Sequence, residues 1–195
     1  MAWLRGVLTV VLIVTAVIAE VTVLPLLGLP GAVPDAVTVT VVAIGFRAGP
    51  VRGSIAGLLA GLLIDLVPPA DGLLGVTAVI LVVVGYFAGL LGGEDDRPAF
   101  AMIALTGLLA GGAVLGLALI GGLVSDPRMS WERVPELLLT QTIYALVLAA
   151  FVLPGIGVLW RRVDPPPPRY QVGRQERGGR RLGVGVGVGE SGASL

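Results

Sequence analysis

The sequence predicts an all-α integral membrane protein with about six transmembrane helices, followed by a polar tail. Of its 195 residues, 55% are hydrophobic and only 13% are charged, whereas a typical soluble domain has about 25% charged residues. A soluble protein of this composition could not cover its surface with polar groups, so lipid must be the solvent for most of the chain. Short segments rich in Pro and Gly separate the apolar runs and mark the turns between helices.

The first apolar run extends from about Trp3 to Leu24. It has the basic start and hydrophobic stretch of a secretory signal peptide, here with Arg5 at the start. No small-x-small cleavage motif closes the stretch, because Glu20 and further apolar residues follow it. We therefore interpret the run as an uncleaved first transmembrane helix.

The second segment is short, from about Asp35 to Ala48, and Gly49-Pro50 ends it, because Pro cannot continue a helix and disfavours helical angles in the residue before it. Pro50 then begins the third segment, which reaches about Val67. The second segment has about 14 residues and a length of about 21 Å, against a bilayer core of about 30 Å. We expect this helix to be buried among its neighbours or to cross where the bilayer is thinned. A re-entrant hairpin of residues 35–67 is the alternative.

Three further helices are predicted over residues 73–92, 99–124 and 135–160, which completes a transmembrane domain of residues 1–163. After Trp160 the composition changes to four consecutive prolines, Pro165 to Pro168, and then to a Gly- and Arg-rich stretch. Such a stretch cannot bury enough apolar surface to fold alone. Residues 164–195 are therefore predicted to be a disordered cytoplasmic tail.

The arginines predict the orientation. All 13 basic residues are Arg, and with a cytoplasmic amino terminus only Arg128 and Arg133 fall outside, which leaves 11 inside. The positive-inside rule then favours six spans with both termini in the cytoplasm. Trp3 and Trp160 would both lie near the cytoplasmic interface, where aromatic belts occur.

The sequence excludes several kinds of chemistry. It contains no His and no Cys, which removes thiol nucleophiles, disulfides, most zinc and haem sites and the commonest general base. There is no phosphate-binding loop, no nucleotide-binding fingerprint and no nucleophile beside a base. We expect no catalytic residue, no cofactor, no metal site and no nucleic-acid partner.

Glycines recur every four residues in the second and third segments, with Asp65 continuing the register: Gly45, Gly49, Gly53, Gly57 and Gly61. Small residues at this spacing allow two helix backbones to approach closely in lipid. We predict a helix-packing seam through Gly53, Gly57 and Gly61, with Gly85 and Gly89 as a further small pair. The alternative is that membrane helices are simply rich in Gly, of which this chain has 30. Whether the seam lies within the protein or on a partner is open.

In the six-helix layout, Glu20, Asp35 and Asp65 converge on the outer half of the bundle. Asp35 suits an N-cap, because a helix N-terminus has free N–H groups and a favourable dipole. Asp65 ends a helix, where the dipole opposes it, so it needs either solvation at the headgroup level or a partner such as Arg128 or Arg133. Ionisable residues at membrane level suggest function by default. The candidates for polar or partner recognition are therefore the three acids and the two arginines: Glu20, Asp35, Asp65, Arg128 and Arg133.

Polar residues early in the sixth helix could face the same outer cavity. They are Glu136, Gln141 and Tyr144. Glu136 equally suits the start of a helix, where acidic residues are favoured.

Several features occur in a distinctive order: the Pro34-Asp35 start of a short helix, the Gly49 to Gly53 break, the segment from Gly57 to Asp65, the turn from Gly72 to Gly75, and the segment from Gly85 to Gly89. In this order they resemble the rod shape-determining protein MreD family, over residues 3–163.

The resemblance implies a non-enzymatic scaffold of the bacterial cell-elongation machinery in the cytoplasmic membrane, involved in cell shape and the regulation of peptidoglycan synthesis. It implies the bitopic protein MreC and a peptidoglycan polymerase and transpeptidase as partners. It also implies a fold like that of the substrate-capture subunits of energy-coupling-factor transporters. The alternative function is therefore a small-molecule-binding subunit of a vitamin-type transporter, although aromatic residues, at 5%, are few for such a pocket. A structural membrane protein of unrelated function is a third possibility.

Overall fold

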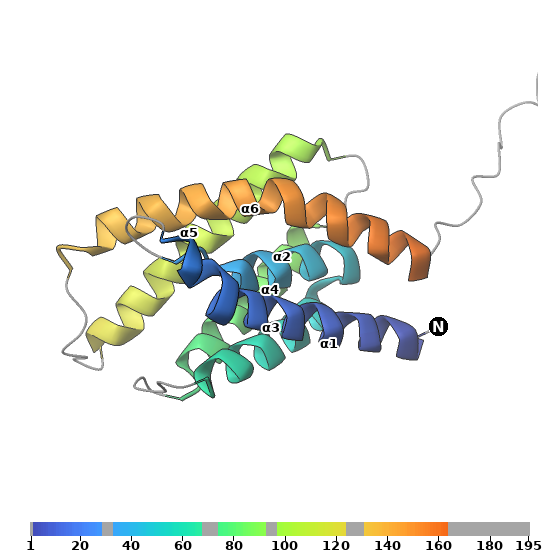
Figure 1. Ribbon diagram of the computed structural model, residues 1–195, viewed down its shortest axis with the longest axis horizontal. Coiled ribbons are helices and arrows are strands. Elements are labelled where there is room, and N and C mark those ends of the chain that lie inside the picture. Colours follow the sequence, from blue (N-terminus) through green and yellow to red (C-terminus); the bar gives the residue numbers. More distant parts are fainter. Residues whose placement is uncertain (1, 29–32, 68–73, 93–96, 124–130, 164–195) are drawn as a thin grey trace, which may run out of the picture. The chain divides into compact units, whose positions relative to one another are not determined.

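A computed structural model of the protein describes residues 2–28, 33–67, 74–92, 97–123 and 131–163. These ranges contain no strand, and the α-helices in them are α1 (Ala2–Ile18), α2 (Ala36–Ala48), α3 (Pro50–Asp65), α4 (Val76–Leu91), α5 (Ala99–Leu123) and α6 (Val134–Val163) (Figure 1). The protein is therefore helical, with a helix in each of the six predicted ranges. The predicted disordered tail, residues 164–195, lies outside the described residues, as does Arg128.

Three helical segments are long and apolar enough to cross a membrane. They are Trp3–Leu27 with 25 residues, Ala99–Leu123 with 25 and Val134–Val163 with 30. Two shorter apolar helices, α2 and α4, have 13 and 16 residues. At 1.5 Å per residue, α2 is only about 20 Å long.

The first segment is not one continuous α-helix, although the sequence predicts a single run to Leu24. The α-helix ends at Ile18, a π-helical turn follows at Ala19–Val23, and a 3₁₀ turn at Leu24–Leu27. Pro25 explains the change, because it has no N–H and its ring would collide with the carbonyl group four residues earlier. The N–H of Leu24 instead donates to the Ala19 carbonyl oxygen, five residues back.

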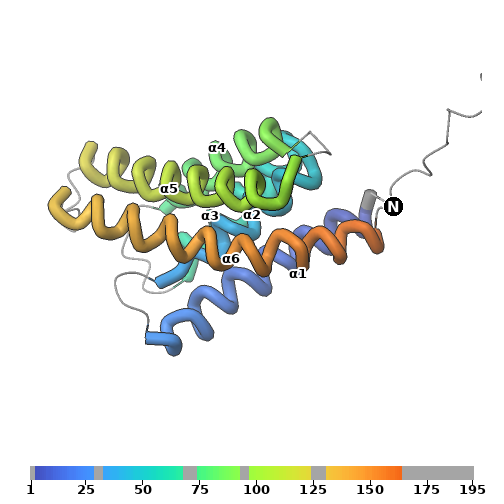
Figure 2. Tube along the Cα trace, turned by 90° about the horizontal axis from the view of Figure 1, so that it is seen from above, coloured from blue at the N-terminus to red at the C-terminus, as the bar shows by residue number. Residues whose placement is uncertain are grey.

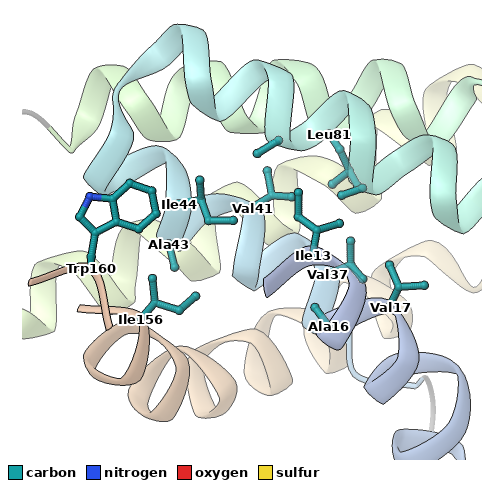
Figure 3. Close-up of a cluster of buried hydrophobic side chains, with 12 residues drawn as sticks. Ile13, Ala16, Val17, Val37, Val41, Ala43, Ile44, Leu81, Ile156 and Trp160 are labelled. Carbon is teal, nitrogen blue, oxygen red and sulfur yellow. The ribbon is translucent and has the colours of Figure 1, made fainter. Parts of the chain in front are cut away.

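Helix α2 lies at the centre of the protein (Figure 1). All of its residues from Ala36 to Phe46 are buried, and it contacts each of the other five α-helices. Each of the three hydrophobic clusters includes α2 residues, for example Ile44, Val42 and Val39. Figure 3 shows the first cluster, where α1 and α6 also contribute. The prediction that this short helix is buried among its neighbours is confirmed.

The glycines of α3 lie against the backbone of α4. A Cβ placed on Gly57 would lie 2.0 Å from the carbonyl oxygen of Leu81, and one on Gly61 would lie 2.2 Å from the Cα of Ala78. On the other side of the contact, a Cβ on Gly89 would lie 2.3 Å from the Cα of Pro50. In these three contacts, later residues of α3 lie against earlier residues of α4, so the two helices run antiparallel. The glycine seam therefore lies within the protein and not on a partner.

Three glycines from three helices meet at one point of this seam. A Cβ on Gly53 would lie 2.2 Å from the Gly85 carbonyl oxygen and 3.0 Å from the Cα of Gly45. A Cβ on Gly45 would in turn lie 2.9 Å from that same oxygen. Only residues without a side chain allow α2, α3 and α4 to approach this closely.

Helices α5 and α6 lie side by side and antiparallel (Figure 2). Gly107 of α5 faces Leu146, and Gly111 faces Thr142. The expected placement of two tryptophans in an aromatic belt needs a correction. Trp3 is 81% exposed, but Trp160 of α6 is only 6% exposed, because its ring packs against the protein core.

The α3–α4 contact predicts a large effect of a single methyl group. We expect Gly57→Ala to lower the free energy of unfolding by about 3 kcal/mol, because the added Cβ meets backbone atoms that cannot move aside. The measurement is thermal or SDS unfolding of the detergent-purified chain. Gly112→Ala is the matched control, because a Cβ there would meet nothing within 4 Å. Equal stabilities of the two variants would contradict the assignment of the seam.

Candidate functional site

The amino terminus of α2 is held by the side chain immediately before it. The Thr38 N–H donates to Oδ1 of Asp35 at 2.6 Å, and the Thr38 hydroxyl donates to Oδ2 of the same carboxyl group. This is the geometry of an N-cap, in which a side chain accepts an N–H that has no partner within the helix. The prediction that Asp35 caps α2 is confirmed.

A second carboxyl group reaches the same helix end from the π-helical turn after α1. Oε2 of Glu20 accepts a hydrogen bond from the Val37 N–H at 2.8 Å, and its carboxyl group lies near the Ala36 N–H. Glu20 and Asp35 together therefore accept the N–H groups of Val37 and Thr38 in the first turn of α2. Because these groups carry the positive end of the helix dipole, acidic partners suit them.

The carboxyl groups of Glu20 and Asp35 are neighbours at this helix end. The pair thus links the end of the first membrane segment to the start of α2 through one small polar cluster.

A side chain of α6 holds the segment that precedes α2. Nε2 of Gln141 donates to the Val33 carbonyl oxygen at 2.9 Å. Gln141, which lies early in α6, is therefore at the same end of the helices as the start of α2. Glu136 is exposed and takes no part in the hydrogen bonds of this cluster.

The structure gives Asp65 a partner other than the arginines considered from the sequence. Oδ2 of Asp65, at the end of α3, accepts the N–H of Gly75 at 2.8 Å and that of Ala78 at 3.4 Å. It therefore caps the amino terminus of α4. Arg133 is exposed and forms no ion pair with Asp65 in the described part of the chain, while Arg128 is not described.

The role of Asp65 could be anticipated only indirectly. Gly75 precedes α4 with a positive φ of 93°, and it has no side chain with which to cap the helix. A predicted helix whose own start lacks a Ser, Thr, Asp or Asn needs an acceptor from elsewhere. That deficit is visible in the sequence, but the residue that supplies the acceptor is not.

The structure brings Glu20 and Asp35 together, and it places Asp65 at a different helix start. All three acids accept backbone N–H groups, so their observed role is to hold helix ends in position. Comparisons with protein-family models, with curated proteins and with solved structures found no match for this chain.

Removal of the Asp65 carboxyl group tests the α4 cap. We expect Asp65→Ala to lower the free energy of unfolding by about 1–3 kcal/mol, because two backbone N–H groups lose their acceptor. Asp65→Asn keeps an oxygen acceptor and should lose less. The alternative is that Asp65 acts mainly through an ion pair with Arg133. In that case, exchanging the two residues in a double variant would restore the stability that each single variant loses in SDS unfolding. We expect no such rescue.

Substitutions of Glu20 test the second cap of α2. Glu20→Gln keeps an oxygen for the Val37 N–H and removes the repulsion with Asp35, so its stability should equal or exceed that of the original chain. Glu20→Ala leaves the N–H groups without an acceptor and should cost about 1–3 kcal/mol. Thermal unfolding in detergent measures both. Equal losses in the two variants would show that the charge of Glu20, not its capacity as an acceptor, holds α2.

Proposed function

We propose that the chain is a non-enzymatic membrane scaffold of the bacterial cell-elongation machinery, similar to the MreD family. In this function it takes part in cell shape and in the regulation of peptidoglycan synthesis. The resemblance depends on the ordered combination of several features, and the observation that supports the proposal concerns one of them, the segment from Gly57 to Asp65. Each distinctive residue of that segment has a specific structural role, since Gly57 and Gly61 contact the α4 backbone and Asp65 caps α4.

We further propose that the chain crosses the bacterial cytoplasmic membrane six times, with both termini in the cytoplasm. In this topology the short helices α2, α3 and α4 cross as one closely packed unit, stabilised by α1, α5 and α6. The distribution of charge supports it. Arg5 at the start of α1, Arg47 at the end of α2 and Arg52 at the start of α3 belong to one end of the helices, while Glu20 and Asp35 belong to the other.

The contacts of the acids favour a scaffold over a subunit that captures a small molecule. A cationic ligand would need carboxylates that are free to bind it, but Glu20, Asp35 and Asp65 already accept backbone N–H groups. We propose that partners, namely a bitopic protein of the MreC type and the peptidoglycan polymerase and transpeptidase, dock on the outer faces of the helices.

Purification of the tagged full chain from its host membrane tests this function. We expect a membrane protein of the elongation machinery to co-purify and to be identified by mass spectrometry. A tagged unrelated polytopic protein at the same expression level is the control. Tight binding of a vitamin by the detergent-purified chain alone, with no such partner recovered, would support the transport subunit instead and contradict the scaffold.

A further inference from the structure

The exposed apolar face of α3 and α4 is short along the helix axes. After Arg52, the exposed side chains of α3 are Ile and Leu as far as Leu66, and those from Leu74 to Val83 in α4 are Leu and Val. At 1.5 Å per residue, the stretches from Arg52 to Leu66 and from Leu74 to Tyr86 are about 21 Å and about 18 Å long. Even the complete helices, of 16 residues each, are only about 24 Å long. A bilayer core is about 30 Å thick, so neither helix matches it.

Polar side chains of the two helices lie at one level. The contact of Gly53 with Gly85 brings the two backbones together there, and a Cβ placed on Gly85 would lie 3.2 Å from the Ser54 nitrogen. Arg52 and Ser54 flank Gly53, and Tyr86 follows Gly85. Three polar side chains from two helices therefore mark the same level, more than one turn before the end of α4.

Tyr86 indicates that this level belongs to the lipid headgroups. Its side chain is 45% exposed and forms an edge-to-face pair with Phe87. An aromatic ring with a polar tip is favoured at the level of the headgroups and not among acyl chains. Side chains on a helix also lean toward its N-terminus, which for Tyr86 is away from the nearer end of α4. Headgroups that meet its hydroxyl group must therefore lie as deep as Tyr86 itself.

Helix α5, which packs against α4, has a much taller apolar face. It contains no charged residue from Ala99 to Leu123, and its exposed residues Phe100 and Leu123 are about 35 Å apart along the axis. A helix that is longer than the bilayer core can tilt to fit, whereas tilting a short helix lowers its height further. The exposed faces of α5 and of the α3–α4 pair therefore match different bilayer thicknesses.

The outward residues of α3 and α4 suit acyl chains better than another helix. Helices pack against one another in membranes through small residues, and every Gly and Ala residue of α3 and α4 is buried. The exposed positions of both helices carry only larger side chains. The small residues are thus used within the protein, and the remaining face is suited to lipid.

We propose that α3 and α4 thin the bilayer beside them to about 20 Å, while the lipids beside α5 keep their ordinary thickness. Arg52 and Tyr86 then lie at one headgroup level, and Leu66 and Leu74 lie near the other. The partner of this face is lipid with short acyl chains. The proposal rests on the membrane location proposed above.

Two fluorescent labels at one height test the thinning. The chain contains no Cys, so Phe87→Cys and Leu108→Cys, both at exposed positions, each provide a single labelling site. A Cβ on Gly116 of α5 would lie 3.5 Å from Cγ1 of Ile80 in α4, and from this contact Phe87 and Leu108 lie about equally far along the two helices. In phosphatidylcholine vesicles, we expect a nitroxide on the lipid headgroup to quench the Phe87 label more strongly than a nitroxide in mid-chain does. The Leu108 label should show the reverse order.

The dependence of stability on bilayer thickness is a second test, which needs no label. Thermal unfolding of the full chain should occur about 5 °C higher in dimyristoleoyl-phosphatidylcholine vesicles than in dierucoyl-phosphatidylcholine vesicles, whose acyl chains are much longer. Arg52→Leu combined with Tyr86→Leu lengthens the apolar face and should reduce this difference. Phe100→Leu, which changes an exposed aromatic residue of α5, is the control and should leave the difference unchanged.

Three results would overturn the proposal. Stronger quenching of both labels by the mid-chain nitroxide would show an ordinary bilayer thickness beside α4. A Phe87 label that neither nitroxide reaches would show that protein, such as a second copy of the chain, covers the face. The third is an unfolding temperature of the original chain that is the same in both lipids. Chains that do not float with the vesicles would instead contradict the membrane location, and the thinning would fall with it.

Discussion

The backbone N–H groups at the start of α2 impose the constraint on which the rest of the structure depends. A helix of 13 residues that is buried along its length has its first turn away from water, where an unpaired N–H costs several kcal/mol in an apolar environment. Asp35 accepts the Thr38 N–H, and Glu20 supplies the acceptor for the Val37 N–H from the first apolar segment. Because Glu20 must reach the start of α2, this hydrogen bond fixes the end of the first segment beside that helix. Glu20 itself lies in the π-helical turn at this end of the segment.

The second constraint is distance between backbones. Short helices offer few side chains for contact, and lipid provides no hydrophobic drive that would press them together. Close approach at glycine compensates, because it brings many backbone atoms into van der Waals contact at once. At the junction of Gly45, Gly53 and Gly85 this happens for three helices together. The caps and the glycines are complementary, since the caps set where α2 and α4 begin and the glycines determine how deeply they pack.

The apolar runs and the Pro and Gly breaks were enough to predict six helices close to their observed limits, because both signals are local. The four-residue glycine spacing predicted the packing face of α3 for the same reason. The partner of each acid was not predictable, because the capping of α4 by Asp65 joins residues that are brought together only by folding. The burial of Trp160 was missed because an aromatic residue near a predicted interface suits both a lipid-facing belt and a contact with another helix. The interruption of the first segment was visible in Pro25 but was outweighed by the continuous hydrophobicity.

These observations change the role expected of the acids at one end of the bundle. From the sequence, the acids at the outer end were the candidates for recognition, because isolated charges at membrane level are costly and usually functional. In the structure their cost is offset by helix N-termini, so they need no external partner. Arg47, in the last turn of α2, stands at a helix C-terminus where the dipole favours a cation, and it forms no ion pair with another described residue. The charges at both ends of α2 are therefore matched to the helix dipole, with the acids at its start and Arg47 in its last turn.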